Sequence, residues 1–172
     1  MSTTPRVAVP EHAHRDDGSV EMGKVIAEHA PALAEARRRY FETLSDLVSE
    51  DPVVHELLRL TTAELTGCRL CRNQRSAAAF EAGVDETVIA EARSGRYDGF
   101  DTRARTALEL GERIRAHPGD LADADDGPAE AVGLASADVT AMVMTTTRAL
   151  ADGKALVALG LEPEDYPVQV PA

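Results

Sequence analysis

The chain has few aromatic residues, few lysines and only two cysteines. Three Phe, three Tyr and no Trp make up 3% of its 172 residues, and Lys24 and Lys154 are its only lysines. Two cysteines exclude the disulfide scaffold that stabilises many small secreted domains. No apolar run approaches the ~18 residues that a membrane span needs, and the first twenty residues lack the apolar core of a signal peptide. We therefore expect a cytoplasmic protein that makes no membrane contact.

The charge balance excludes further classes of partner. The formal net charge is -12, so nucleic acid and anionic lipid surfaces would repel the chain. Hydrophobic residues make up 44% and charged residues 28%, which is typical of a globular protein. A chain of this length can bury one full core. We expect a flexible arm over residues 1–20 and one domain over residues 21–172.

The composition favours an all-α fold, because Ala, Leu, Glu and Arg dominate and all four are strong helix formers. Residues 119–135, rich in Asp and Gly, are expected to form an exposed loop. The run Arg37-Arg38-Arg39 is interpreted as a solvated face. Capping residues, prolines and apolar spacing predict about six helices in an orthogonal bundle: from Pro31 through Val48, Pro52 to Gly67, Cys68 to Ala82, Asp85 to Ser94, Asp101 to His117, and Ser136 to Leu156.

One motif carries chemistry: residues 68–71 read Cys-Arg-Leu-Cys at the start of a predicted helix. Side chains three residues apart on a helix are neighbours, and a small adjustment brings them to disulfide distance. The helix N-terminus and the nearby Arg69, Arg72 and Arg75 would stabilise a thiolate. The motif therefore predicts a pair that cycles between dithiol and disulfide.

Three other interpretations of the pair are less favoured. A zinc site needs two further ligands, and no second Cys pair or His pair stands at suitable spacing. A thioredoxin-type site would follow a strand, which the sequence lacks. The cysteines could instead be inert and buried, although chance rarely places two at this spacing beside three arginines.

Residues 56–71 resemble the core of the alkylhydroperoxidase D / carboxymuconolactone decarboxylase family, in its peroxidase-related branch. Members carry a glutamate, eleven residues and a CxxC pair, followed by A-x-x-x-G and an acidic residue. Here Glu56 precedes the pair, and Ala79, Gly83 and Asp85 follow it. The resemblance implies an all-α domain in a homo-oligomer, a small peroxide as substrate, a protein dithiol as reductant, and no metal or organic cofactor.

The resemblance also implies a role for each site residue. Cys71 would be the peroxidatic thiol, Cys68 the resolving thiol and Glu56 the proton acceptor. Helix polarity alone would instead favour Cys68 as the more acidic thiol. Arg75 stands where the family has a histidine, and arginine cannot relay protons near neutral pH. It could stabilise the thiolate or pair with Glu56.

The function predicted is a thiol-dependent peroxidase or a related disulfide oxidoreductase. The alternative is a non-catalytic or functionally diverged helical oligomer of the same fold, because Arg75 replaces the histidine. Lactone decarboxylation, which the family name suggests, is disfavoured because that branch does not depend on a CxxC pair.

Overall fold

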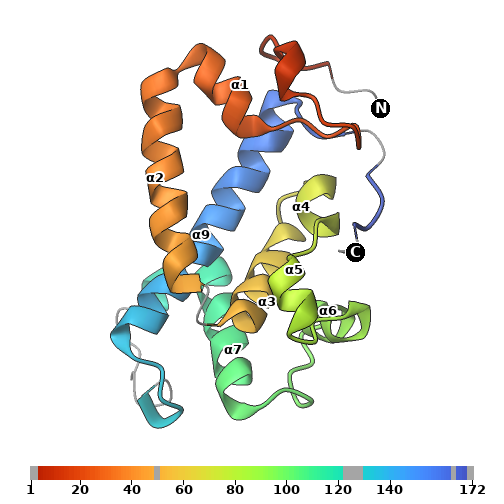
Figure 1. Ribbon diagram of the computed structural model, residues 1–172. Helices are drawn as coiled ribbons and strands as arrows, with labels where there is room; N and C mark the ends of the chain where they lie inside the picture. The colour runs from red at the N-terminus through yellow and green to blue at the C-terminus, as the bar shows by residue number, and fades with distance from the viewer. Residues whose placement is uncertain (1–3, 49–50, 122–129, 164–165, 170–172) are drawn as a thin grey trace.

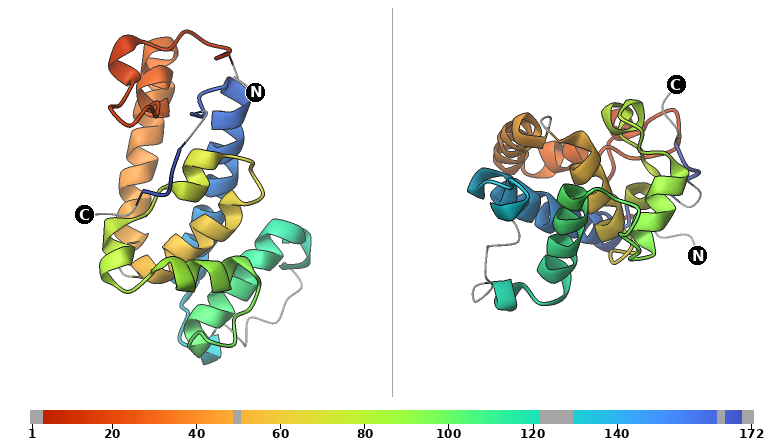
Figure 2. Two further views of the ribbon diagram at one scale, coloured as in Figure 1. Left: turned by 90° about the vertical axis from the view of Figure 1, so that its right-hand side faces the viewer. Right: turned by 90° about the horizontal axis from the view of Figure 1, so that it is seen from below.

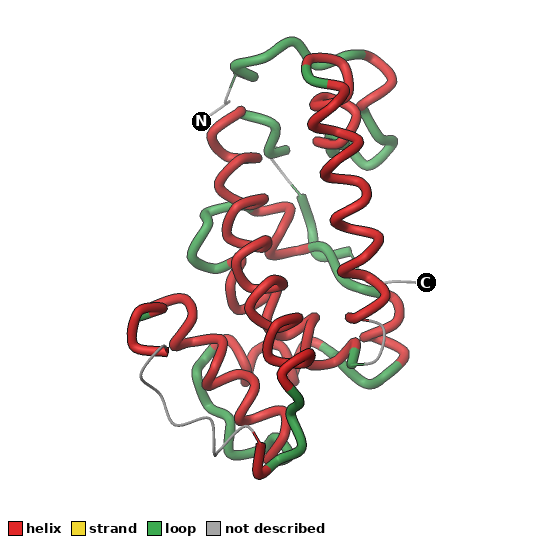
Figure 3. The backbone as a smooth tube through the Cα atoms, turned by 90° about the vertical axis from the view of Figure 1, so that its left-hand side faces the viewer, coloured by secondary structure: helices red, strands yellow, loops and turns green. Residues whose placement is uncertain are grey.

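The computed structural model describes residues 4–48, 51–121, 130–163 and 166–169, and these residues form an all-α fold, as predicted (Figure 1). Figure 3 shows no strand among them, and their only β-type contacts are two isolated bridges, His14–Val20 and Gln74–Gln169. Every helix within these ranges is too short or too polar to cross a bilayer. Residues 122–129 of the predicted acidic loop lie outside the described residues.

Most helices begin where the sequence predicted. Asp51 accepts a hydrogen bond from the Val54 N–H at 3.2 Å, and Pro52 opens the helix that follows. The helices are α1 (Met22–His29), α2 (Pro31–Val48), α3 (Pro52–Ala63), α4 (Arg69–Asn73), α5 (Ala77–Glu81), α6 (Glu86–Arg93), α7 (Thr102–Ala116) and α9 (Ser136–Leu159), with 3-10 turns η1 (Glu11–Ala13) and η2 (Pro118–Leu121).

Two elements differ from the prediction. Helix α1 was not predicted. The single helix expected over residues 68–82 is wrong, because the chain breaks between α4 and α5. Gln74 takes an extended conformation there, and Ser76 caps α5 by accepting from the Ala79 N–H. The extended Gln74 forms a β-bridge with Gln169. This tertiary contact replaces the hydrogen bonding that a continuous helix would have had at this position.

Helix α3 lies at the centre of the fold, between α9 and the smaller helices (Figure 2). Every residue of α3 from Val54 to Ala63 is buried except Arg59, which is partly exposed. One core cluster joins α3 to α6, α7 and the start of α9, with Leu58, Leu108 and Met142 among its buried members. A helix that is buried almost all round must be covered on several sides, and this cluster covers the face of α3 that carries Leu57, Leu58 and Leu60.

A second core cluster surrounds the CxxC turn. It joins the N-terminal arm, α1 and α4 to the far end of α9 and the C-terminal segment, through Ala13, Val25, Cys68, Leu156 and Tyr166. The Arg6 N–H donates to the Leu159 carbonyl at 2.9 Å, so the described part of the arm lies against the end of α9. Segments from both ends of the chain therefore cover the cysteine pair.

Gly153 lets α9 approach the turn that precedes the cysteines. A Cβ at this position would lie 2.6 Å from Cβ and Cγ2 of Thr66. Thr66 is buried and cannot turn away freely, because its Oγ1 donates to the Ala63 carbonyl and accepts from the Cys68 N–H.

We predict that Gly153→Ala lowers the free energy of unfolding by about 1–3 kcal/mol, since the added methyl group overpacks this contact. Urea unfolding measures the loss. Gly23→Ala in α1 is the matched control, because its Cβ would meet only Arg37 Nη1, at 4.0 Å. The control should be neutral or stabilise the fold by up to about 1 kcal/mol. Equal effects of the two variants would contradict the packing argument.

Candidate functional site

Cys68 and Cys71 form a disulfide at the N-terminal end of α4, with a Cα–Cα distance of 5.3 Å. Gly67, at φ +76, turns the chain out of the α3 region, and the left-handed backbone there suits only glycine without strain. Cys68 then caps α4, and its Sγ accepts a hydrogen bond from the Cys71 N–H at 3.2 Å. The predicted pairing of the two sulfurs at CxxC spacing is confirmed.

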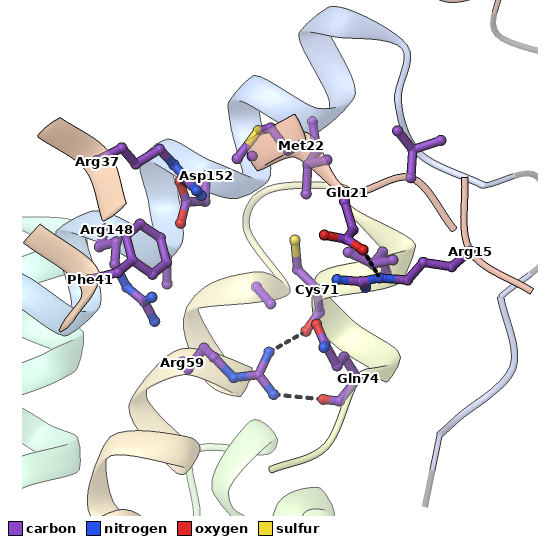
Figure 4. A pocket seen from close by; sticks show the side chains of 16 residues that line it. Arg15, Glu21, Met22, Arg37, Phe41, Arg59, Cys71, Gln74, Arg148 and Asp152 are labelled. Carbon is purple, nitrogen blue, oxygen red and sulfur yellow. Dashed lines mark hydrogen bonds and ion pairs between the residues drawn. The ribbon is translucent and has the colours of Figure 1, made fainter. Parts of the chain in front are cut away.

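The two cysteines differ in accessibility. Cys68 is fully buried in the second core cluster. Cys71 is partly exposed and lines a cavity of about 370 Å³. Figure 4 shows the Cys71 sulfur pointing into this cavity. A small molecule can therefore reach Cys71 directly, whereas Cys68 lies behind it.

The cavity beside Cys71, which we call the thiol cavity, is rich in arginine although the chain is strongly acidic. Four arginines and two carboxylates line it, between the arm, α1, α2, α3, α4 and α9. Apolar side chains such as Met22, Leu70 and Leu156 cover the rest of its wall. The charged lining residues are Arg15, Glu21, Arg37, Arg59, Arg148 and Asp152.

Phe41 organises the α2 side of the thiol cavity. The guanidinium carbons of Arg37 and Arg148 lie 4.1 and 4.5 Å from the centroid of its ring. Arg37 also binds Asp152 of α9 at 3.0 Å. Cation–π contacts of this kind hold the two guanidinium groups in place beside the cavity.

Glu56 lies on α3, and Arg59 holds it in a two-point ion pair. Arg59 Nε and Nη2 donate to the two carboxylate oxygens at 2.8 and 2.7 Å. The Ser76 N–H donates to one of these oxygens at 2.9 Å, and the Glu56 side chain is only 5% exposed. Arg59 also donates to the carbonyls of Cys71 and Gln74, at 2.8 and 2.6 Å. The structure thus links Glu56 to the cysteine helix through Arg59.

Arg75 does not pair with Glu56, so that alternative is wrong. Its Nε and Nη2 donate to the carboxylate of Glu86 at 2.7 and 3.1 Å, and its Nη1 donates to the Arg72 carbonyl at 2.7 Å. The hydrogen bonds from Arg75 lower the pKa of Glu86. Arg75 therefore ties α4 to α6, and its stabilisation of the thiolate stays a prediction.

His55, next to Glu56 in sequence, faces α9 and not the cysteines. Its Nδ1 lies 2.8 Å from Thr145 Oγ1, and both side chains are buried. Burial lowers the pKa of His55 below its ordinary value, while Asp51 and Asp138 oppose this shift. His55 and Glu56 line a second hollow, on the other side of Arg59 and Arg148 from Cys71.

Sequence reasoning missed the arginines of the site. In the predicted solvated run, Arg38 and Arg39 are exposed and pair with Glu35 on their own helix. Arg37 turns inward to Phe41 and Asp152, so the interpretation fails for this residue. Its position on the same α2 face as Phe41 was a signal, since side chains four apart on a helix are neighbours.

No family model and no solved structure matches the chain. Two uncharacterized proteins, from two strains of Mycobacterium tuberculosis, are each 37% identical to it over 75 residues. The match covers 42% of this chain and 26% of each relative, so the chain spans only about a quarter of the curated relatives it matches. These similarities describe no activity, and membership of the alkylhydroperoxidase D family remains a proposal.

We predict that Arg59→Met lowers the free energy of unfolding by about 3–5 kcal/mol, because it leaves the buried Glu56 carboxylate without its cation. Arg39→Met is the matched control. Arg39 also pairs with a glutamate of its own helix, but its side chain is 73% exposed, and exposed pairs contribute less than about 1 kcal/mol. Similar losses in the two variants, measured by urea unfolding, would contradict a structural role for the buried pair.

A second prediction concerns the pH dependence of stability. The folded-state pKa of His55 lies below its unfolded value, so the unfolded chain binds the proton first as pH falls. Stability contributed by neutral His55 is therefore complete above the unfolded pKa of about 6.5 and is lost progressively below it. His55→Gln should flatten the stability profile between about pH 7 and pH 5.

Urea midpoints measured across this range test the prediction. His117→Gln, at an exposed position after α7, is the control and should keep the profile of the parent. If His55→Gln leaves the dependence of stability on pH unchanged, the buried imidazole does not cause the loss of stability below about pH 6.5.

Proposed function

We propose that this chain is a thiol-dependent peroxidase, or a related disulfide oxidoreductase, of the alkylhydroperoxidase D type. Cys71 acts as the peroxidatic thiol and Cys68 as the resolving thiol. The observation that carries the proposal is the unequal exposure of the two cysteines of the disulfide. Cys71 opens into the thiol cavity, and Cys68 is buried behind it at disulfide distance.

The reaction proceeds in two steps on the cysteines. The Cys71 thiolate attacks one oxygen of the hydroperoxide, an S–O bond forms, the O–O bond breaks, and the alkoxide takes up a proton and leaves as the alcohol. The Cys68 thiol then attacks the Cys71 sulfenic acid, the S–S bond forms, and water leaves. The arginines of the thiol cavity favour the attacking thiolate, because cations nearby stabilise the charged form of a thiol.

Glu56 stays the predicted proton acceptor. Its carboxylate already accepts hydrogen bonds from Arg59 and from the Ser76 N–H. Arg59 also binds the Cys71 carbonyl, so the carboxylate and the cysteine helix share one guanidinium. Because arginine does not release its proton near neutral pH, a proton moving between Cys71 and Glu56 needs a water molecule to carry it.

The remaining parts of the proposal follow from the resemblance. A protein dithiol returns two electrons by reducing the disulfide, so the cycle needs no metal or organic cofactor. A dithiol that must be kept reduced suits the cytoplasm. Helix α2 presents Leu33 and Leu47, which are 59% and 45% exposed, and such apolar side chains suit contact with a second copy in a homo-oligomer.

A non-catalytic role is the second candidate. It is favoured by two ion pairs. Arg59 holds the carboxylate of Glu56, and Arg75, which stands in place of the family histidine and cannot relay a proton, is held by Glu86. In that case the disulfide would only hold α4 against the second core cluster. The peroxide experiment below separates the two candidates.

We predict that one equivalent of tert-butyl hydroperoxide converts the reduced protein into the intramolecular disulfide, and that dithiothreitol sustains turnover. Cys71→Ser should abolish peroxide consumption, because it removes the accessible nucleophile. Cys68→Ser should still react once and leave a sulfenic acid at Cys71, which dimedone traps. Intact mass and peroxide consumption measure these outcomes.

The two serine variants are controls for each other, since each removes one sulfur from the same turn. If Cys71→Ser consumes peroxide as fast as the parent, Cys71 is not the peroxidatic thiol. If the reduced parent consumes no peroxide at all, the peroxidase proposal is wrong, and the non-catalytic role is favoured.

A further inference from the structure

Arg148, on α9, is the one arginine of the thiol cavity without a carboxylate partner among the described residues. Arg15 pairs with Glu21 at 3.4 Å, Arg37 with Asp152 at 3.0 Å, and Arg59 with Glu56 at 2.7 Å. The guanidinium carbon of Arg148 lies 4.5 Å from the centroid of the Phe41 ring, and its buried Nε has no hydrogen-bond partner within the same described ranges.

The position of Arg148 is costly for a cation. Burial lowers the pKa of Arg148, and the neighbouring Arg59 and Arg37 act in the same direction. Asp152 acts in the opposite direction, but one of its oxygens already accepts from Arg37. A partly buried guanidinium in these surroundings gains from an anion that brings its own acceptor oxygens.

Phe41 does not consume the hydrogen-bond donors of this guanidinium. The contact between Arg148 and the Phe41 ring is a cation–π contact, which uses the charge of the guanidinium and none of its N–H donors. Two of these donors match the two oxygens of a carboxylate. Figure 4 shows Arg148 beside Phe41, across the cavity from Arg15 and Glu21, with Cys71 between them.

The rest of the cavity defines the body of the ligand. A volume of about 370 Å³ is of the size that small-molecule sites have. Apolar groups of Met22, Leu70 and Leu156 line it, which suits a short hydrocarbon chain. Three of the four arginines are each paired with a carboxylate, so Arg148 supplies the one uncompensated positive charge of the cavity among the described residues. A carboxylate neutralises this charge, whereas a phosphate dianion would leave a negative charge beside Glu21 and Asp152.

We propose that Arg148 binds the carboxylate of a small, otherwise apolar acid, and that the far end of this acid lies against the sulfur of Cys71. The binding itself is independent of any turnover. The assignment of a substrate rests on the proposed function. If Cys71 reduces peroxides, the substrate class is an organic hydroperoxide that carries a carboxylate.

Titration of the oxidised, disulfide-bonded protein with hexanoate tests the binding. Calorimetry should detect hexanoate, and Arg148→Met should raise its Kd by about tenfold or more, because the charged hydrogen bonds are lost. Arg39→Met, which removes an exposed arginine of α2, should leave the Kd unchanged. Thermal unfolding of each variant is measured first, and Arg148→Lys, which keeps the charge but loses the two-point geometry, should give an intermediate Kd.

Hexanol should bind more weakly than hexanoate, because it lacks the charge. Four results would overturn the proposal: no binding of hexanoate to the parent protein, equal binding to Arg148→Met, tighter binding of hexyl phosphate than of hexanoate, or equal binding of hexanol and hexanoate.

Kinetics distinguish this proposal from the proposed function. The titration uses the disulfide form and needs no turnover. Binding of hexanoate without reduction of peroxide would therefore contradict the proposed function and support the proposed binding site. If the protein does reduce peroxides, Arg148→Met should raise KM for a short hydroperoxy acid by at least about tenfold more than KM for tert-butyl hydroperoxide, which has no carboxylate for Arg148 to bind. Loss of a cation near the thiolate acts on both substrates alike, so the ratio of the two changes isolates the carboxylate contact. An equal change in both KM values would overturn the assignment of the substrate class.

Discussion

The guanidinium of Arg59 is the group on which the arrangement of the site depends. It neutralises a carboxylate that α3 carries into the core, and it donates to the carbonyls of Cys71 and Gln74 at the end of α4. The same carboxylate accepts from the Ser76 N–H just before α5. Backbone groups that a continuous helix would have bonded internally are thus satisfied by one buried ion pair. The pair fixes where α4 ends and how the cysteine turn lies against α3.

The second constraint on the site is the set of segments that bury the cysteine turn. The arm, α1, the end of α9 and the C-terminal segment meet around Cys68, and Figure 2 shows the C-terminal segment running beside α4. The Gln169 N–H donates to the Asn73 carbonyl, which helps to satisfy the end of this short helix. Because α4 has only five residues, its position comes from these tertiary contacts more than from helix propensity.

The parts of this structure that could be predicted are those that depend on near neighbours in the sequence. Asp85 and Asp101 cap the helices that were predicted to begin at them, and Asp51 caps the helix predicted from Pro52, because a cap needs only the next three residues. The Cys68–Cys71 pairing follows from a three-residue spacing in the same way. The fold class followed from composition alone.

What could not be predicted involves partners far apart in the sequence. The break after Asn73 depends on Arg59 and Glu56 in another helix. Arg75 finds Glu86 in α6, eleven residues on, and not the glutamate of the motif that suggested its role. Arg37 turns inward to Asp152, which lies 115 residues along the chain. Phe41, four residues on, indicates the face of α2 that Arg37 shares, but nothing near the arginine run indicates Asp152. Charged residues have no periodicity that reveals their partners, so the electrostatics of the site needed the structure.

Two indications in the sequence conflict on which sulfur reacts, and the proposed cycle accommodates both. Helix polarity favours negative charge on Cys68, whose Sγ accepts from the Cys71 N–H, whereas the family pattern assigns the attack on peroxide to Cys71. In the proposed cycle both can hold. Cys71 is the sulfur that a peroxide or an incoming reductant can reach. When a reductant thiolate attacks Cys71, Cys68 is the leaving group, and the N–H donor stabilises the thiolate that leaves. In the proposed cycle, the partly exposed sulfur of Cys71 therefore attacks the peroxide, and the buried, hydrogen-bonded sulfur of Cys68 leaves when the disulfide is reduced.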